Sequence, residues 1–378
     1  MKVLNVNCTL DPVGGGGAAE RTFQMSRALA KAGIPCTVLT LDIGLTPERI
    51  RELEGTRVIA LHCVFKRLYI PAFSYALVQK ALEEADIVHL MGHWSLLNAL
   101  VYFLVRRLHK PYVVCAAGTL PIYGRSKTLK RLYNWIVGRR IVQNANACIP
   151  ITRDERSHFA TYGVEANQVV VIPNGINPDN YPENDGAEFR CKYGLGDYPF
   201  ILFVGRLNSI KGPDLLLRAF CKVKDDFQVH RMVFAGPDEG MLSELREIAA
   251  AHGISDRVLF TGYLGGVAKS QAFHASELVV IPSRQEAMSI VVLEAGIAGK
   301  PVLITDQCGF DEVASRGGGQ VVPASVDGLQ RGLAEILRDQ AKLNAMGTNL
   351  RKYTLEHFDW DSIVHRYLEL YTRILRPG

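Results

Sequence analysis

The chain has 378 residues, enough for two domains that each bury a substantial core. It carries 43 Lys and Arg against 38 Asp and Glu, a formal net charge of +5, and 48% of its residues are hydrophobic. This composition is typical of α/β proteins. The modest charge is compatible with anionic substrates or a membrane surface, whereas a nucleic-acid partner is not indicated because no basic aromatic module is present.

The cysteines and the apolar runs bear on location. Eight cysteines form no Cys-x-x-Cys pair and mostly lie among apolar residues, which predicts reduced thiols in a cytoplasmic protein. Residues 1–7 are expected to form a strand rather than a signal peptide. The longest apolar run, residues 96–105, is too short to cross a bilayer of roughly 30 Å, so no transmembrane helix is expected.

The first half of the chain alternates apolar strands with helices. Strands are expected at residues 3–6, 36–41, 87–90, 112–116 and 147–151, and helices at residues 18–32, 75–84 and 96–109. Such alternation predicts a parallel sheet with helices on both faces.

A glycine run, Gly14 to Gly17, follows the first expected strand and precedes a helix. Its amides can approach a ligand closely because no side chain intervenes, although a merely flexible turn is the competing interpretation. The spacing does not match the dinucleotide-binding fingerprint. His93 follows a later strand and is a candidate for lining a crevice on the acceptor side, against the alternative of a polar loop histidine. The histidines show no zinc-binding spacing.

Residues 125–140 interleave cations with Leu129, Leu132, Trp135 and Ile136. This pattern suits a helix lying on anionic lipid headgroups and therefore a peripheral contact with the inner membrane. The competing interpretation is a helix whose apolar side faces the core and whose basic side faces solvent.

The second half repeats the alternation, with strands expected at residues 200–204, 231–235, 258–261, 278–281 and 302–305. Polar, proline-bearing residues 177–186 are expected to be the linker. The fold class is thus α/β with two Rossmann-like domains in tandem: an N-terminal domain over 1–178, a C-terminal domain over 186–355 and an amphipathic helix within 356–378. We expect the active site in the crevice between the domains.

Two glutamates, Glu286 and Glu294, bracket the loop and helix that follow the strand at 278–281. The helix is expected over residues 289–298, and about 12 Å of helical rise would separate the glutamates. One carboxylate would then meet a sugar and the other a ribose, while the helix N-terminus faces a diphosphate. A solvated pair of helix-face acids is the alternative. The following segment, 298–306, supplies a helix stop and another buried strand, which places the pair in a unit that opens a ligand crevice.

Arg206 and Lys211 flank the loop after the strand at 200–204, where two cations can converge on one diphosphate. The Asp359-Trp360-Asp361 segment has the letters of a metal-binding Asp-x-Asp motif. It lies at the start of the terminal helix, where acids favour the helix dipole and caps, so a structural role is expected and no metal site is predicted.

These segments together resemble the retaining glycosyltransferases of family 4, group 1, which have the GT-B fold. The resemblance is carried by the Glu-x7-Glu frame of Glu286 and Glu294 with Gly-Lys-Pro-Val at 299–302, by Gly-Arg-Leu with Lys-Gly at 205–212, by Val-Ile-Pro-Asn-Gly-Ile at 171–176, and by the glycine run. It spans nearly the whole chain and is most specific in the second half. It implies that the terminal helix crosses back to brace the first domain.

The resemblance also implies roles. Glu286, Arg206 and Lys211 would be catalytic, with Glu286 on the sugar hydroxyls and the two cations on the diphosphate in place of a metal ion. The donor would further be held by Glu294 at the ribose, by the 287–289 loop of Ala287, Met288 and Ser289, and by Asn174. Gly15 and Gly16 would face acceptor or phosphate together with His93. No cofactor is implied.

The implied reaction is transfer of a sugar, with retention, from a nucleotide diphosphate sugar to a hydroxyl of a cell-envelope glycan or lipid-linked saccharide. Two departures bear on it. Many relatives carry glycine where this chain has Ala287, and alanine tolerates positive φ poorly. The loop at 116–119 lacks the histidine or arginine that many relatives place near the sugar, so no side-chain base is assigned; in retaining members the leaving phosphate is thought to accept the proton.

Other functions remain open. A sugar-nucleotide epimerase or a phosphorylase would share the architecture, and Ala287 and Ala117 are also compatible with a non-catalytic nucleotide-sugar-binding subunit of a glycan-assembly complex. An NAD-dependent oxidoreductase is disfavoured, because Asp42 is the only acid near the position expected for ribose binding.

Overall fold

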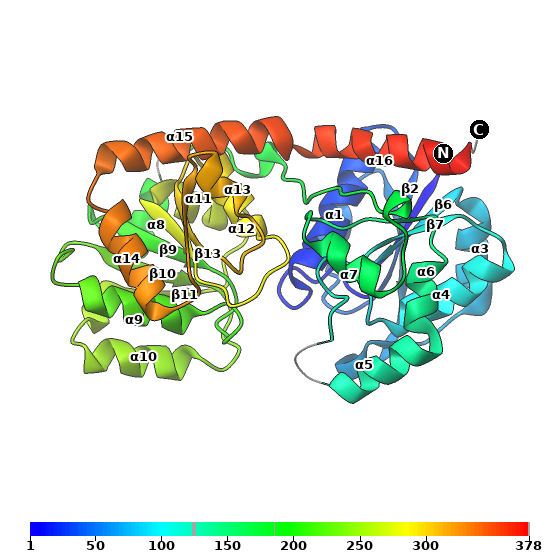
Figure 1. The fold of residues 1–378 in the computed structure, drawn as a ribbon, viewed down its shortest axis with the longest axis horizontal. Coiled ribbons are helices and arrows are strands. Elements are labelled where there is room, and N and C mark those ends of the chain that lie inside the picture. The colour runs from blue at the N-terminus through cyan, green and yellow to red at the C-terminus, as the bar shows by residue number, and fades with distance from the viewer. Residues whose placement is uncertain (123–125, 185, 377–378) are drawn as a thin grey trace. The chain divides into compact units, whose positions relative to one another are not determined.

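The computed structural model describes residues 1–122, 126–184 and 186–376, and its elements are shown in Figure 1. Contacts divide the chain into two compact units. Unit 1 comprises residues 1–175 and 360–378, and unit 2 comprises residues 176–359. The predicted linker, residues 177–186, therefore belongs to unit 2, and the final helix belongs to unit 1. Within the described residues, no helix combines the length and apolarity needed to cross a membrane.

Unit 1 contains a six-stranded sheet in the order β3-β2-β1-β6-β7-β8, in which every pairing is parallel. Its strands are β1 (Val3–Val6), β2 (Cys36–Leu41), β3 (Thr56–Leu61), β6 (Ile87–Met91), β7 (Tyr112–Cys115) and β8 (Ala147–Cys148). A short antiparallel pair, β4 (Cys63–Phe65) and β5 (Ile70–Pro71), flanks the 3-10 turn η1 (Lys66–Leu68).

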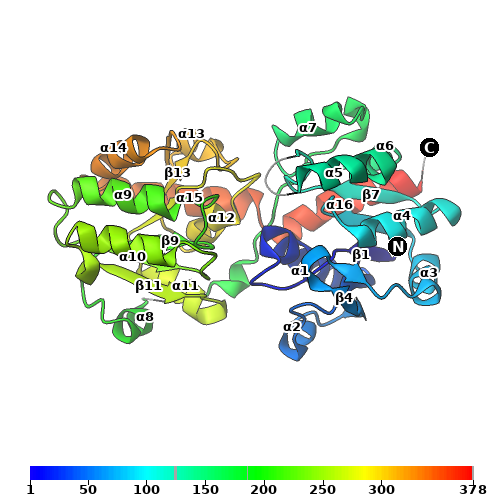
Figure 2. The same ribbon diagram turned by 90° about the horizontal axis from the view of Figure 1, so that it is seen from below.

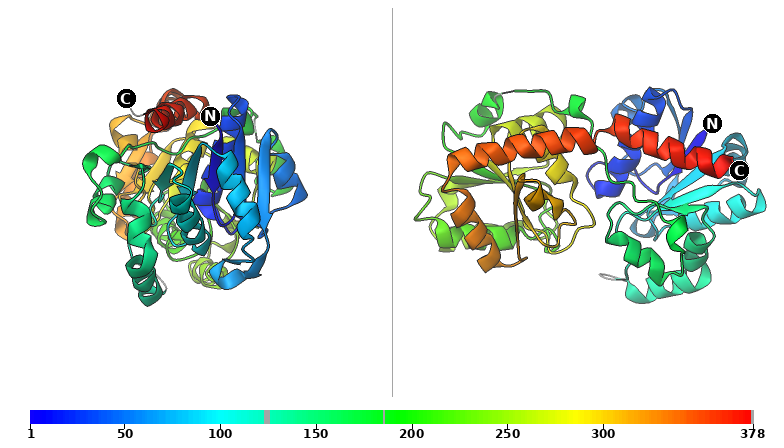
Figure 3. Two further views of the ribbon diagram at one scale, coloured as in Figure 1. Left: turned by 90° about the vertical axis from the view of Figure 1, so that its right-hand side faces the viewer. Right: turned by 45° about the horizontal axis from the view of Figure 1, so that its top comes forward.

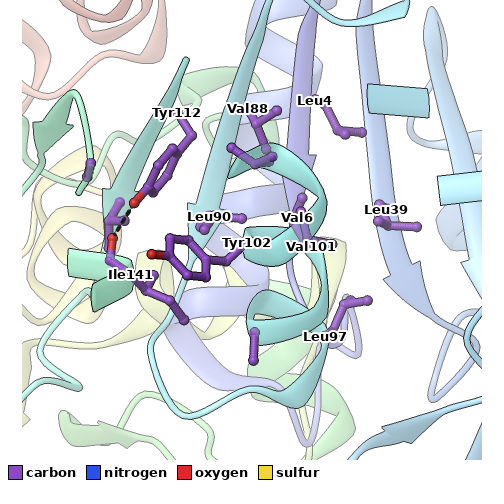
Figure 4. Packing of buried hydrophobic residues seen from close by; sticks show 14 of the residues in the cluster. Leu4, Val6, Leu39, Val88, Leu90, Leu97, Val101, Tyr102, Tyr112 and Ile141 are labelled. Atoms are coloured by element: carbon purple, nitrogen blue, oxygen red, sulfur yellow. Dashed lines mark hydrogen bonds between the residues drawn. The ribbon is translucent and has the colours of Figure 1, made fainter. Parts of the chain in front are cut away.

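The helices of unit 1 cover both faces of this sheet (Figure 2). They are α1 (Gly16–Lys31), α2 (Pro47–Arg51), α3 (Tyr75–Glu84), α4 (Leu96–Arg107), α5 (Lys127–Tyr133), α6 (Arg139–Gln143), α7 (Glu155–Thr161) and α16 (Trp360–Leu375), with a π-helical segment η2 (Asn134–Gly138) and a 3-10 turn η3 (Ala166–Gln168). On one face, Val101 and Tyr102 of α4 pack with Leu4, Leu90 and other strand residues, and the Tyr112 hydroxyl donates to the Ile141 carbonyl at 2.8 Å (Figure 4).

Helix α16 completes unit 1, where it packs against α1 (Figure 3). The two helices meet at Arg21, whose guanidinium is buried. Arg21 donates to Asn174 Oδ1 at 2.5 Å, to the Ile172 carbonyl at 3.1 Å and to the Tyr367 hydroxyl of α16. A buried guanidinium needs such acceptors, so this cluster fixes the end of the chain to the unit in which it begins.

Unit 2 repeats the architecture, with an all-parallel sheet in the order β11-β10-β9-β12-β13-β14. The strands are β9 (Phe200–Val204), β10 (Arg231–Ala235), β11 (Val258–Gly262), β12 (Leu278–Ile281), β13 (Val302–Thr305) and β14 (Gly319–Val322). In each sheet the first three strands in chain order extend to one side of the first strand. The next strand then pairs with the other side of the first strand, and the sheet grows in that direction. The reversal points, β1 beside β6 and β9 beside β12, are where open α/β sheets bind ligands at the strands' carboxyl ends.

The helices of unit 2 are α8 (Ala187–Lys192), α9 (Pro213–Val223), α10 (Leu242–Ala251), α11 (Gly266–Ala275), α12 (Ile290–Ile297), α13 (Glu312–Ser315), α14 (Val326–Ile336) and α15 (Gln340–His357), with 3-10 turns η4 (Pro178–Asn180) and η5 (Ser255–Arg257). Residues of α9, α10 and α14, among them Leu216, Leu245 and Leu333, share one core with the sheet. Helix α12 packs against α15.

Candidate active site

Two loops meet at the reversal point of the second sheet. Residues 205–212 follow β9 and residues 282–289 follow β12, and the Arg284 amide donates to the Ile210 carbonyl at 2.7 Å. Gly212 has a φ of +67°, and a Cβ at this position would overlap the Pro282 carbonyl oxygen. Glycine is therefore required for this approach of the two loops.

Because the loops touch, Lys211 and Glu286 form an ion pair, with 2.5 Å between Lys211 Nζ and Glu286 Oε1. The Ser283 hydroxyl donates to the same oxygen at 2.7 Å. The Glu286 side chain is only 10% exposed, so its carboxylate is fixed rather than freely solvated. The structure thus brings together two residues that are 75 positions apart in the sequence.

Arg206 lies on the same loop as Lys211 and pairs with a different acid. Its guanidinium is 3.0 Å from Glu239 Oε1, and the Asn208 amide nitrogen is 2.6 Å from Glu239 Oε2. Glu239 was not predicted as a partner of Arg206, because it follows a different strand, β10, and no local motif marks it. Two cations on one loop, each facing a carboxylate, can offer positive charge to an anionic ligand that displaces or joins those acids.

The loop at 287–289 is held by the loop after β13. The amides of Glu286 and Ser289 donate to the carbonyls of Gln307 and Cys308 at 2.8 and 3.2 Å. Gly309 has a φ of +61°, and a Cβ there would overlap the Ala287 carbonyl oxygen. Met288 is buried, and the buried Ser289 hydroxyl has no hydrogen-bond partner among the described residues.

Many relatives carry glycine at the position of Ala287, which predicted a left-handed backbone conformation there. Ala287 does not adopt that conformation. Among the described residues, the non-glycine positions with positive φ are Tyr69, His109, Ala117 and Ser126. The strain expected at Ala287 is therefore absent, whereas Ala117, in the loop after β7, adopts a φ of +47°.

Glu294 projects from α12 into a polar cluster of its own. Its Oε1 accepts hydrogen bonds from Lys269 Nζ at 2.5 Å and from the Tyr181 hydroxyl at 2.6 Å. Its Oε2 is buried without a partner among the described residues. A buried carboxylate oxygen in this state is costly, so a hydroxyl from a bound ligand would satisfy it. The predicted helical rise of about 12 Å between the two glutamates assumed a helix over the whole span, but α12 begins only at Ile290, so just the part from Ile290 to Glu294, the first turn of the helix, rises as a helix.

Sequence reasoning missed Lys269 and Tyr181 as partners of Glu294. Lys269 lies on α11, and Tyr181 follows η4 in the segment predicted to be the linker. No local motif identifies either residue as part of the site, because the packing of unit 2, and not the neighbouring sequence, brings them to Glu294.

The remaining candidates lie in unit 1. Gly15 and Gly16 follow β1, and Gly16, with a φ of +60°, is the first residue of α1, which begins two residues before the predicted start. A Cβ on Gly16 would meet nothing within 4 Å, whereas one on Gly15 would lie 2.6 Å from the Asp11 carbonyl oxygen. Asn174 engages Arg21 through its side-chain oxygen.

His93 follows β6, beside β1 at the reversal point of the first sheet, but its ring is buried rather than presented to solvent. Its Nε2 is 2.8 Å from Asn134 Oδ1, and the rings of Trp94, Tyr133 and Tyr162 surround it. Burial lowers the pKa of His93 to about 4, and the Asn134 hydrogen bond acts in the opposite direction. The structure thus places His93 in a buried aromatic cluster after β6.

Both units of the chain match known protein families. Residues 16–175 match the model described as "Glycosyl transferase 4-like domain", and residues 186–353 match the model "Glycosyl transferases group 1". The chain belongs to the group 1 glycosyltransferases. Its fold is GT-B, with two Rossmann-like domains built on parallel six-stranded sheets.

Individual relatives of this group 1 glycosyltransferase are distant. An uncharacterized glycosyltransferase of Methanocaldococcus jannaschii is 31% identical over 217 residues, which are 56% of this chain and 55% of the relative. A GDP-mannose-dependent alpha-(1-6)-phosphatidylinositol monomannoside mannosyltransferase of Mycobacterium tuberculosis is 30% identical over 239 residues, 60% of this chain and 61% of the relative. Several of the best-matching curated relatives are thus matched over only about half of their length.

The fold is similar over a much larger part of the chain. The crystal structure of Anabaena Alr3699/HepE in complex with UDP and glucose matches with a TM-score of 0.81 at 20% identity, covering 98% of this group 1 glycosyltransferase and 99% of that chain.

Proposed function

We propose that this chain transfers a sugar from a nucleotide diphosphate sugar to a hydroxyl group, with retention of anomeric configuration. The observation that carries the proposal is the Lys211–Glu286 pair, 2.5 Å apart, at the reversal point of the second sheet, with Arg206 on the same loop and Glu294 on the helix that follows. The UDP and glucose bound by the Anabaena neighbour and the GDP-mannose in the mycobacterial relative's name support a donor of this class.

Each residue has a role that follows from its chemistry. Arg206 and Lys211 neutralise the diphosphate and stabilise it as it leaves, which requires no metal ion. Glu286 accepts hydrogen bonds from sugar hydroxyls, and Lys211 keeps that carboxylate from repelling the diphosphate. Glu294 accepts a ribose hydroxyl at its unpartnered Oε2. The backbone of residues 287–289, at the N-terminus of α12, lies against the phosphates.

The reaction breaks the bond between the sugar's anomeric carbon and the diphosphate oxygen, and forms a bond from that carbon to the acceptor oxygen on the same face. The acceptor proton passes to the leaving diphosphate, so no side-chain base is needed. We propose that Asn174, Gly15, Gly16 and His93 serve the donor and acceptor from unit 1, which for His93 requires the surrounding rings to move.

The acceptor we propose is a cell-envelope glycan or a lipid-linked saccharide, reached by a cytoplasmic enzyme at the inner face of a membrane. The phosphatidylinositol mannoside in the mycobacterial relative's name supports a lipid-linked acceptor.

The test is turnover of a panel of uridine, guanosine and adenosine diphosphate sugars by the purified protein, with and without EDTA. We expect hydrolysis or transfer of one donor class, unchanged by the chelator, and a product with the donor's anomeric configuration by NMR. Donor binding with no turnover on any acceptor would instead indicate a non-catalytic binding subunit, and an inverted product would contradict retention.

A further inference from the structure

One long stretch of unit 1 contains no acidic residue. Residues 87–153 include no Asp or Glu but hold ten Lys and Arg: Arg106, Arg107, Lys110, Arg125, Lys127, Lys130, Arg131, Arg139, Arg140 and Arg153. Since the whole chain carries +5, all other residues together carry −5. The positive charge of this protein is therefore concentrated in one segment rather than spread over its surface.

Helix α5, the π-helical η2 and α6 lie within this segment and follow one another directly (Figure 2). Their inner side is tied to unit 1: the Tyr133 hydroxyl donates to the Ser95 carbonyl at 3.0 Å, and Asn134 contacts His93. Asn134, Val137 and Gly138 are buried. An amphipathic helix packs one side against the core, and these residues form that side of the helix.

The outer side of the same helix is also apolar. Trp135 is 80% exposed, and Leu129, Leu132 and Ile136 are 51%, 48% and 49% exposed. The interpretation in which these residues face the core is therefore wrong, because the core contacts are made by other side chains. Single exposed apolar residues are ordinary, but four within eight positions of one helix indicate a surface that is covered in use.

Exposed cations flank these side chains. Lys127, Arg131, Arg139 and Arg140 are exposed, and none of them forms an ion pair with another described residue. We call these four cations together with Leu129, Leu132, Trp135 and Ile136 the α5–α6 face. Apolar side chains rimmed by cations match the boundary between the acyl chains and the headgroups of an anionic bilayer.

We propose that the α5–α6 face docks this protein on an anionic lipid bilayer, with Trp135 and its aliphatic neighbours inserted among the acyl chains and the cations on the phosphate headgroups. The aliphatic majority of the exposed side chains favours lipid over nucleic acid, which would require aromatic platforms for bases. The proposal rests on the proposed function only in that a lipid-linked acceptor gives such docking a purpose, since the binding itself is independent of the sugar chemistry.

The experiment is cosedimentation of the full-length protein with vesicles of phosphatidylcholine alone and with vesicles that also contain phosphatidylglycerol. We expect binding to the second kind only, weakened by salt because the cations are exposed. The double variant Lys127→Gln with Arg131→Gln should bind about 30-fold more weakly, which corresponds to about 2 kcal/mol for two cations. Trp135→Ala should bind about tenfold more weakly.

The matched controls lie in unit 2: Arg218→Gln with Lys222→Gln, and Val229→Ala at an exposed apolar site. These variants should bind like the wild type. Tryptophan fluorescence should shift to the blue on binding in the wild type and much less in Trp135→Phe. Donor turnover in solution should be equal in all of these variants, so failure of the docking surface and failure of the proposed function are distinguishable.

Three outcomes would overturn the proposal. They are no vesicle binding by the wild type, equal loss of binding in the variants and their unit 2 controls, and a wild-type dimer in solution that Trp135→Ala converts to a monomer. The last outcome would assign the α5–α6 face to self-association.

Discussion

At the scale of single residues, the candidate site is a set of opposite charges held in place by loop contacts. Lys211 and Glu286 are each partly shielded from water, and each is the other's counterion in the described residues. Such a pair contributes little to stability compared with the cost of leaving one charge behind. Its value lies in keeping a carboxylate and a cation together where a diphosphate and a sugar would meet.

Lys211→Ala is expected to lower kcat for donor turnover by about 10²-fold to 10³-fold, because the developing charge on the leaving diphosphate loses one stabilising cation. Steady-state kinetics measure this loss. Lys222→Ala, which removes an exposed lysine of the same unit, should keep wild-type kinetics. Equal kinetics in the two variants would remove Lys211 from the mechanism.

His93 predicts a dependence of stability on pH. Its folded pKa of about 4 lies below the ordinary value of 6.5, so between these values the unfolded chain binds a proton that the native state does not. Stability is therefore present above about pH 6.5 and is lost as the pH falls toward about pH 4, by at most about 3 kcal/mol.

Urea unfolding at neutral pH and at acidic pH within that window checks this prediction. His93→Gln should be less stable at neutral pH, where the native hydrogen bond is lost, but should lose less further stability on acidification than the wild type. Burial also lowers the pKa of His89, so His89 contributes to the loss of stability at acidic pH in the wild type and in the variant alike. A pH dependence unaltered by His93→Gln would show that His93 titrates as it does in the unfolded chain.

The ion pairs of the candidate site show which of its residues a single sequence can predict. Glu286, Glu294, Arg206 and Lys211 were predicted from their positions after strands and in a recognisable frame. Their partners Glu239, Lys269 and Tyr181 were not, because each comes from a different loop or helix of unit 2. Which side chain meets which is decided by the packing of these elements, and a single sequence does not display that packing.

At the scale of elements, the strands with continuous apolar runs were predicted with small errors, as for β9 and β12, whose predicted and observed bounds agree. β3 (Thr56–Leu61) was missed because it is an edge strand in which only Ile59 and Leu61 are buried, so it lacks the continuous apolar run of the central strands. β14 was missed because Gly317 to Gly319 indicate a loop, although Gly319 begins the strand. The hydrophobic periodicity of residues 125–140 likewise predicted neither the π-helical geometry of η2 nor the exposure of the apolar side chains on the outer side of α5.

The packing of α12 on α15 gives a stability prediction. A Cβ on Gly296 would overlap Thr354 Oγ1, so Gly296→Ala should lower the free energy of unfolding by about 1–3 kcal/mol, because overpacking forces the helices apart. The Thr354 hydroxyl is buried without a partner among the described residues, so Thr354→Ala alone should cost much less.

The double variant Gly296→Ala with Thr354→Ala should recover part of the lost stability, as measured by urea midpoints in a double-mutant cycle. Additive effects of the two substitutions would mean that Gly296 is needed for a reason other than its approach to Thr354.

At the scale of the whole molecule, the chain builds two sheets with the same strand order and closes unit 1 with its last helix. The tandem Rossmann-like organisation was predictable because the alternation of strands and helices occurs twice. The return of α16 to unit 1 was implied only by the family resemblance, because an amphipathic helix does not specify which unit covers its apolar side.

Tyr367 tests how much that return stabilises unit 1. Tyr367→Phe removes an acceptor from the buried Arg21 guanidinium, so we expect unit 1 to lose about 1–3 kcal/mol of unfolding free energy. Urea unfolding is the measurement, with Tyr198→Phe at an exposed position of unit 2 as the control. Unchanged stability in Tyr367→Phe would mean that Arg21 is satisfied without α16.

The proposed function depends on unit 2 binding a nucleotide diphosphate sugar through Arg206, Lys211, Glu286 and Glu294. Calorimetric titration of the wild type, Arg206→Ala, Glu294→Ala and the control Arg218→Ala with uridine, guanosine and adenosine diphosphate sugars tests it directly. We expect the wild type and Arg218→Ala to bind one nucleotide class, and we expect Arg206→Ala and Glu294→Ala to bind it at least tenfold more weakly, a loss of about 1.4 kcal/mol or more. Absent binding in the wild type, or equal binding in all four proteins, would contradict it.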